Sequence, residues 1–335
     1  MPPRARILPA SQSAPGTSGI PETGRKTVRF TLVFDIAQGY YFKHRKSRQP
    51  GMTVQQSKSP TELEFGPRRP EFDIDDLLAS DWHGGSAFRT AWFNALSMLF
   101  PLGEKFFIES VVAFRDRIED PRLLGEIASF QAQESVHRLK HQRYNERLCQ
   151  LRGYDLPSFE GPLRKRMAWA YRELSARRRL AGTTANEHLT AIMADDMLRN
   201  RDCFVGVDSR IADLWRWHGV EETEHKSVAF DVHAAVGGTI GERRMALLLN
   251  TFYFFKDSFR ITRAMLRHDG KLWSLRVWAS GINYLFIKPG VLRRIARPYF
   301  RFFRKGFHPW EQDNRNLIAE WETQRQTDSR IAESP

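Results

Sequence analysis

Apolar residues recur every three to four positions between residue 87 and about residue 240, which is the repeat of amphipathic α-helices. No stretch of this region shows the alternation typical of a β-strand. Asp120-Pro121 suits the beginning of a helix, and Gly153 suits the end of one. The pattern predicts an all-α protein with helices over residues 87–99, 102–118, 121–151, 163–180, 184–199 and 208–236.

Two of these helices carry polar residues in the middle of an inward-facing stripe. In the helix 121–151 the stripe contains Ile127, Phe130, Glu134, His137, His141, Tyr144 and Leu148. In the helix 208–236 it contains Ile211, Trp215, His218, Glu222, His225, Ala229, Val232 and Val236. Charged side chains are almost never buried without a partner. The stripes therefore predict that a shared interior partner binds these polar residues.

Both polar stretches contain the motif Glu-x-x-His, with Glu134 and His137 in one helix and Glu222 and His225 in the other. Residues three apart lie on one face of a helix. Two such pairs, with one Glu from each of two further helices, form the ligand set of a di-metal site in a four-helix bundle. A single Glu-x-x-His is common and usually forms a weak surface pair, so the prediction depends on the matched pair.

The other two helices must supply the remaining carboxylates. Glu187 is the only acid on the inward stripe of the helix 184–199, among small residues that leave room for metals or a substrate. In the helix 102–118, Glu104 and Glu109 lie on different candidate stripes, because residues five apart do not share a face well. Periodicity leaves the choice between them open. Imidazole and carboxylate ligands suit iron, manganese or zinc.

The two ends of the chain differ from this helical region. Residues 1–75 are rich in Pro, Gly, Ser and basic residues, and they are predicted to be disordered because they have little apolar surface. A short strand at 28–35, and translation from Met52 instead of Met1, are left open. The predicted organisation continues with a di-metal bundle over 76–240, an aromatic and basic helical extension over 241–312, and a polar tail over 313–335.

The composition adds a strong positive charge, +13 over 335 residues, so nucleic acid and anionic membranes are candidate partners. No helix-turn-helix, zinc-finger or RNA-binding signature is present, which argues against specific nucleic-acid binding. The extension 241–312 mixes large aromatic residues with Arg and Lys. It therefore either contacts a membrane interface or packs over the bundle.

Cysteine content and hydropathy bear on the compartment. Two cysteines, Cys149 and Cys203, exclude a disulfide framework and a cysteine-rich zinc site. No apolar segment is typical of a signal peptide or reaches the roughly 18 residues of a spanning helix. We expect a cytoplasmic protein, with peripheral contact to the inner membrane as an alternative, and leave a homodimer open.

Five motifs in order resemble the bacterial family called predicted metal-dependent hydrolases: FPLGEKFF (100–107), QESVHRLKHQRYN (133–145), TTANEHLTA (183–191), WHGVEETEHKSVAFDV (217–232) and FHPW (307–310). The similarity covers about residues 85–312 and implies a ferritin-like four-helix bundle with extra C-terminal helices. It implies Glu104, rather than Glu109, as the ligand from the first helix. The other ligands that it implies are Glu134, His137, Glu187, Glu222 and His225. Four further residues in the same motifs are expected to orient these ligands: His141, His188, His218 and Glu221.

Two kinds of chemistry fit such a site. A carboxylate-rich ligand set in a bundle is typical of iron proteins that use dioxygen, and it favours two iron ions that oxidise a hydrophobic or acyl substrate. The family's name points instead to hydrolysis by a metal-activated water, with Glu221 or Glu224 accepting the proton and manganese or zinc as alternative metals. A lipid-like substrate follows if the extension contacts a membrane. A metal-binding or interaction protein without enzymatic activity is a further hypothesis.

Overall fold

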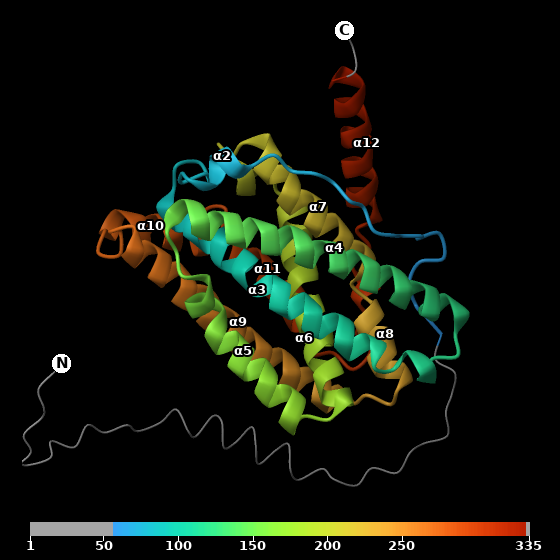
Figure 1. Ribbon diagram of the computed structural model, residues 1–335. Coiled ribbons are helices and arrows are strands. Elements are labelled where there is room, and N and C mark those ends of the chain that lie inside the picture. Colours follow the sequence, from blue (N-terminus) through green and yellow to red (C-terminus); the bar gives the residue numbers. More distant parts are fainter. Residues whose placement is uncertain (1–55, 333–335) are drawn as a thin grey trace, which may run out of the picture. The chain divides into compact units, whose positions relative to one another are not determined.

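The computed structural model describes residues 56–332, in which the regular elements are helices and no strand occurs (Figure 1). The predicted all-α class is confirmed, while the ferritin-like fold within that class stays a prediction. The chain divides into two units, residues 1–50 and 51–335, and all described residues belong to the second. The strand predicted at 28–35 and the disorder predicted for the first 55 residues lie outside the described part.

Four helices carry the predicted polar stripes: α3 (Ala87–Val112), α4 (Pro121–Arg152), α6 (Ala176–Arg199) and α7 (Ser209–His225). α3 packs along α4 and α6 packs along α7, while α3 also contacts α6 and α4 contacts α7 (Figure 1). The stripe predicted on α4 is buried from Ile127 to Leu148. The inward faces of these helices therefore meet in one interior.

The remaining helices surround these four. α9 packs on α3 and α6, α11 packs on α6, and α12 contacts α7, so helices from the C-terminal third cover the bundle. The elements are α2 (Asp75–Leu78), η1 (Arg115–Arg117), α5 (Leu156–Glu173), η2 (Arg201–Phe204), α8 (Val228–Ala235), α9 (Ile240–His268), α10 (Leu275–Ile282), the π-helical turn η3 (Asn283–Ile287), α11 (Val291–Arg301), η4 (Pro309–Glu311) and α12 (Arg315–Ala332).

Local sequence explains the ends of α4. Asp120 accepts a hydrogen bond from the backbone of Arg122, and Pro121 occupies the first helical position. At the other end, Gly153 adopts a left-handed conformation with a φ of 69°. The helix predicted over 121–151 is thus confirmed.

Pro101 does not separate two helices as predicted, because α3 runs continuously through it. A proline inside a helix leaves the carbonyl four residues earlier without its donor. That carbonyl belongs to Ser97, and it accepts a hydrogen bond from Nδ2 of Asn145 at 2.9 Å. A side chain of α4 therefore replaces the backbone bond that Pro101 removes.

Two other predicted boundaries are wrong. The break expected at Gly182 lies at Leu174–Ser175, where the Ser175 side chain caps α6; Gly182 lies inside α6, and its carbonyl accepts a hydrogen bond from Asn250 of α9. The helix predicted over 208–236 divides at Lys226–Ser227 into α7 and α8. The Lys226 ammonium there donates to the carbonyl of Gln312 at 2.7 Å, which joins this turn to the C-terminal segment.

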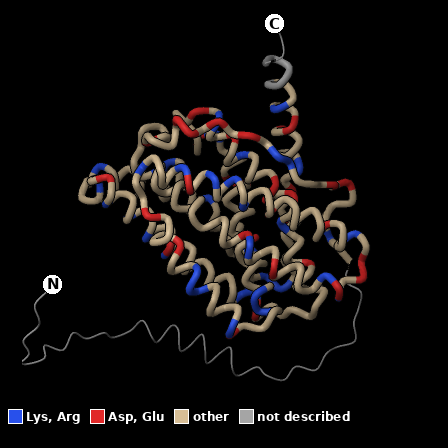
Figure 2. The backbone as a smooth tube through the Cα atoms, in the orientation of Figure 1, with Lys and Arg blue, Asp and Glu red and all other residues tan. Residues whose placement is uncertain are grey.

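The irregular segment 57–74 is held against α4 and α7, although it falls within the stretch predicted to be disordered. Ser57 donates from its backbone to Asp120 at 2.7 Å, and the rings of Phe72 and Trp217 lie 5.7 Å apart. Charged positions of both signs are spread over the described helices (Figure 2). The segment crosses the bundle near α7, and it contributes an arginine to the site described next.

Candidate metal centre

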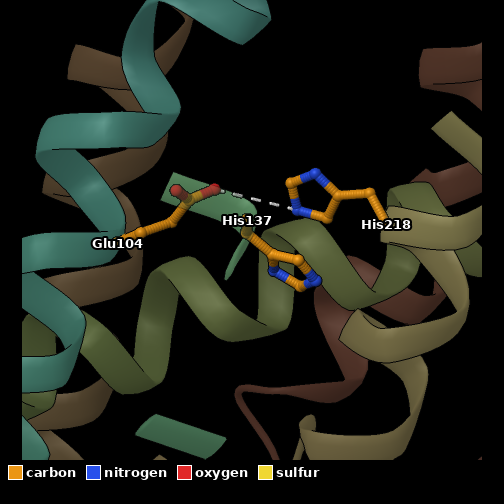
Figure 3. A group of neighbouring side chains, drawn as sticks. All are labelled: Glu104, His137 and His218. Carbon is orange, nitrogen blue, oxygen red and sulfur yellow. Dashed lines mark ion pairs between the residues drawn. The ribbon is translucent and has the colours of Figure 1, made fainter. Parts of the chain in front are cut away.

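Seven buried side chains from four helices lie together inside the bundle, and none exposes more than 4% of its surface. They are Glu104 on α3, Glu134 and His137 on α4, Glu187 on α6, and His218, Glu222 and His225 on α7. Two groups have ligand atoms within 4.8 Å of one another: Glu104, His137 and His218, and Glu134, Glu222 and His225. In Figure 3 the Glu104 carboxylate points toward the ring of His218.

Glu222 lies at the centre of this arrangement. Its Oε1 is 3.0 Å from Nε2 of His218, 3.7 Å from Nδ1 of His137 and 3.7 Å from Nε2 of His225. One carboxylate thus faces three imidazoles that come from two helices. Glu222 is therefore placed to connect the two groups.

Most ligand atoms of these groups have no hydrogen-bond partner among the described residues. Both carboxylate oxygens of Glu104, Glu134 and Glu187 are unpaired, and so are Nδ1 of His137 and Nε2 of His225. The latter nitrogen lies 3.3 Å from Glu134 and 3.5 Å from Glu187. An unpaired buried polar group costs about 1–3 kcal/mol, and a charged one costs more. Divalent cations are bound by carboxylates and imidazoles, so this donor set fits a metal.

The outer nitrogen of His137 is held by Glu221, whose Oε2 lies 3.0 Å from Nε2. The other oxygen of Glu221 accepts hydrogen bonds from the indole of Trp217 at 3.0 Å and from the Arg68 backbone at 2.9 Å. A carboxylate with these donors accepts the imidazole proton, which leaves a lone pair on Nδ1, toward Glu222. Of the two roles expected for Glu221, this placement favours positioning of His137, as the motifs imply, over proton transfer.

The outer nitrogen of His225 is held by Gln133, whose Oε1 lies 2.9 Å from Nδ1. The amide group of Gln133 donates to Glu224 at 2.6 Å, and Glu224 also accepts two hydrogen bonds from the guanidinium of Arg68. Because the amide nitrogen faces Glu224, the amide oxygen must accept from His225. Glu224 therefore lies behind the ligand group too, and not at its open side as a proton acceptor requires.

The outer nitrogen of His218 is held by a second histidine. Its Nδ1 lies 2.7 Å from Nε2 of His141, and Nδ1 of His141 lies 2.9 Å from the hydroxyl of Ser97. That hydroxyl donates to Oδ1 of Asn145 at 2.7 Å, so it accepts from His141. His141 then accepts from His218, whose Nε2 is left with a lone pair facing Glu222. His141 thus orients a neighbour as predicted from the motifs, whereas His218 itself joins the ligand group.

The shifts in pKa follow from burial and from mutual repulsion. Burial raises the pKa of three carboxyls, and repulsion by neighbouring carboxylates raises it further: Glu104, Glu134 and Glu187. Burial would also raise the pKa of Glu222, but the His218 and His225 rings beside its carboxylate outweigh this effect and hold the pKa well below its usual value. Burial lowers the pKa of His137, which keeps that ring neutral and able to bind a cation.

Two candidates from the sequence lie elsewhere. His188 is not beside the ligands as expected: its ring stacks on Phe302, with ring centres 4.6 Å apart, and meets Phe307. Adjacent helical residues point about 100° apart, so the inward position of Glu187 turns His188 toward the C-terminal helices. Glu109 is exposed and accepts a hydrogen bond from the Tyr171 hydroxyl, whereas Glu104 lies in the group.

An apolar cavity of about 80 Å³ reaches the group from the side of Glu222 and His218. Residues of α3, α6 and α7 line the cavity, together with residues of η3 and α11. The lining includes Trp92, Phe100, Met193, Met197, Trp215, Tyr284, Leu285 and Leu292. A non-polar part of a small molecule can therefore lie next to the candidate ligands.

A family model described as "Predicted metal-dependent hydrolase" matches residues 66–313, which include every residue of the candidate centre and Arg68. The chain belongs to this family. Neither a curated protein nor a solved structure matches the chain. Among the helices of the described part, none is long and apolar enough to cross a membrane.

Proposed function

We propose that the protein is a hydrolase whose metal ions are held by the seven grouped Glu and His side chains. The observation that carries the proposal is the set of buried, unpaired ligand atoms that converge from four helices. The family points to the same class of enzyme. The proposed ligands are Glu104, Glu134, His137, Glu187, His218, Glu222 and His225, and the set has room for the two ions expected from the motifs.

Metal ions bound there would lower the pKa of a coordinated water and polarise the bond to be cleaved. The protein's own contribution is to orient three imidazoles toward the proposed ions, through Glu221, Gln133 and His141. Burial keeps competing water away from these side chains.

The substrate class that we propose is a small molecule with an apolar chain, such as an ester or amide of a fatty acid. The cavity supports it, because its lining is aromatic and aliphatic up to the side chains of Glu222 and His218. The apolar chain would lie between α6 and α7, beside Met197 and Trp215, with the bond to be cleaved against Glu222.

Metal analysis of two matched variants tests the centre. Glu104→Gln removes a proposed ligand, and we expect metal content after reconstitution to fall at least about tenfold. Glu109→Gln makes the same change five residues along α3, at an exposed carboxylate, and should leave the metal content unchanged. Equal loss, or no loss, in the two variants would contradict the ligand assignment.

Activity is tested separately with nitrophenyl esters of increasing acyl length. The metal-loaded protein should hydrolyse the octanoyl ester with a higher kcat/KM than the acetyl ester, because the cavity is apolar. Chelation should abolish both activities, and addition of metal should restore them. If the metal-loaded protein hydrolyses none of these esters and no corresponding amide, the proposal is contradicted.

Oxidation by two iron ions is the second candidate, and one observation favours it: four of the seven proposed ligands are carboxylates, as in proteins that use iron with dioxygen. The family description favours hydrolysis. Mixing the reduced iron-loaded protein with dioxygen distinguishes the two. A new absorbance band with oxygen consumption would support oxidation, and its absence in a protein that hydrolyses esters would support the hydrolase.

A further inference from the structure

The outer surface of α10 and η3 carries an apolar stripe. Leu275, Ala279, Ile282 and Phe286 follow one another at intervals of four, three and four residues, which places them on one face of the helix. Leu275 is 85% exposed, Ile282 54% and Phe286 51%, and the adjoining Trp273 is 86% exposed. An outward stripe of this size is unusual for a protein surface that contacts only water.

The inner surface of the same segment is already packed against the bundle. Gly281 is buried against the ring of Phe88 on α3, and the rings of Trp278 and Phe88 meet edge to face at 5.6 Å. Tyr284 and Leu285 point inward as well and line the apolar cavity. The segment is therefore apolar on two faces, and the described residues cover only one of them.

The segment that bears the stripe is basic in sequence, and the carboxylates that pair with Lys271 and Arg294 come from other parts of the chain. Residues 271–310 contain no Asp or Glu, in contrast to the mixed charges of the other helices. Four of the basic residues have acidic or carbonyl partners within the described part: Lys271, Arg293, Arg294 and Arg304. No ion pair of the described residues involves the rest of the basic residues in this range: Arg276, Lys288, Arg297, Arg301 and Lys305.

We propose that α10, η3 and the start of α11 form a docking surface for an anionic lipid bilayer. The apolar stripe would enter the interface between headgroups and acyl chains, and the unpaired Arg and Lys residues would contact lipid phosphates. The surface lies on an interface and does not span it, in agreement with the absence of a spanning helix in the described part.

Charge decides between a bilayer and another protein as the partner. A second copy of this chain would bring two basic segments face to face, each without Asp or Glu over residues 271–310, and the repulsion of like charges opposes that contact. An anionic bilayer supplies both the negative charge and the apolar layer. The position of Tyr284 and Leu285, between the stripe and the cavity, also places the cavity directly beneath the docking surface.

Co-sedimentation with vesicles tests the proposal in the full-length protein, and it requires neither bound metal nor hydrolysis. The result is thus independent of the proposed function. The parent protein should bind vesicles of phosphatidylglycerol and phosphatidylcholine mixed equally, more weakly at high salt. Ile282→Glu/Phe286→Glu should reduce binding at least about tenfold, because two apolar side chains no longer enter the interface.

The matched control is Leu139→Glu/Leu248→Glu, which adds the same charge at leucines of α4 and α9 that are 58% and 51% exposed. It should bind within about threefold of the parent, because a distant charge acts weakly. Both double variants keep the basic N-terminal residues, so these cannot cause a difference between them. If the first variant does not fold by circular dichroism, Leu275→Ser replaces it and should weaken binding about threefold to tenfold.

Three results would overturn the proposal. The first is a parent protein that does not bind the mixed vesicles at low salt. The second is equal binding by the two double variants. The third is a parent dimer in analytical ultracentrifugation that Ile282→Glu/Phe286→Glu dissociates, without any vesicle binding, since the stripe would then join two copies of the chain.

Discussion

An imidazole can bind a cation only through a nitrogen that has no proton, so the partner of its other nitrogen decides whether it is a ligand. In this protein Glu221, Gln133 and His141 are these partners, and they bind His137, His225 and His218 in that order. Each partner is buried and is itself held by a further hydrogen bond. The candidate centre therefore depends on residues that do not touch the proposed metal.

Gln133→Leu tests this dependence. The substitution keeps the approximate size of the side chain but removes the acceptor for His225, so the proton is no longer held on Nδ1. We expect metal affinity to fall about 10- to 100-fold, with the helical content unchanged. Competition with a chromogenic chelator measures the affinity.

Gln142→Leu is the matched control, because Gln142 is exposed on the same helix and, within residues 56–332, its amide donates only to Glu146. Its metal affinity should equal that of the parent protein. Retention of full affinity by Gln133→Leu would show that His225 needs no fixed partner.

His83 predicts how stability depends on pH. Burial lowers the pKa of His83 from 6.5 to about 3, with a further contribution from Arg89, and neither ring nitrogen has a hydrogen-bond partner in the described part. Between these pH values the unfolded chain binds one more proton than the folded protein, so stability falls as the pH drops, by up to about 1.4 kcal/mol per pH unit.

His83→Phe removes this contribution. Between pH 7 and pH 5 the variant should lose about 2 kcal/mol less stability than the parent protein, as measured by urea denaturation. His268→Phe, at a side chain that is 49% exposed, serves as the control and should follow the parent. A parallel pH profile for His83→Phe would contradict the assignment of this pH dependence to His83.

At the scale of helices, the repeat of apolar residues was sufficient to predict the class and to find the two matched Glu-x-x-His motifs. It could not show that α3 continues through Pro101, because the compensating donor, Asn145, lies on another helix. The repeat also could not choose between Glu104 and Glu109 as the ligand, because each lies on a candidate stripe of apolar residues. Only the packing of α3 on α4 and α6 distinguishes them.

The docking of α10 on α3 gives a prediction at this scale. A Cβ atom added at Gly281 would lie 2.5 Å from the ring of Phe88, so Gly281→Ala must displace the helix or the ring. We expect it to destabilise the protein by about 1–3 kcal/mol. Gly161→Ala in α5 meets no atom within 4 Å and should instead stabilise by about 0.5–1 kcal/mol. Thermal unfolding of both variants should show shifts of opposite sign.

At the scale of the whole molecule, the centre joins parts of the chain that are far apart in sequence. Arg68 lies 156 residues before Glu224, in a segment without regular structure, and it binds both Glu224 and Glu221. No repeat in the sequence marks such a residue, and the composition of residues 1–75 placed it in a region predicted to be disordered. The apolar cavity likewise could not be predicted from the sequence, because its walls come from helices of both the bundle and the C-terminal extension.

This convergence predicts that metal stabilises the whole fold. Without a cation, α3, α4 and α6 bury carboxylates that repel one another and lack hydrogen bonds within the described part of the chain. A metal present at 100 to 1,000 times its Kd adds about 3–4 kcal/mol to the free energy of unfolding. For a domain of this size we expect chelation to lower Tm by roughly 10 °C.

The variant Glu222→Ala makes this last prediction specific to the centre. Glu222 faces three imidazoles, so its loss should abolish most of the difference in Tm between the metal-loaded and chelated protein. Glu109→Gln should keep the full difference, because Glu109 is exposed and outside the group. If chelation lowers Tm equally in the parent and in Glu222→Ala, the metal that stabilises the fold is bound at another place. The unpaired carboxyls of α3, α4 and α6 would then be protonated, which is the direction in which burial already shifts the pKa of Glu104, Glu134 and Glu187.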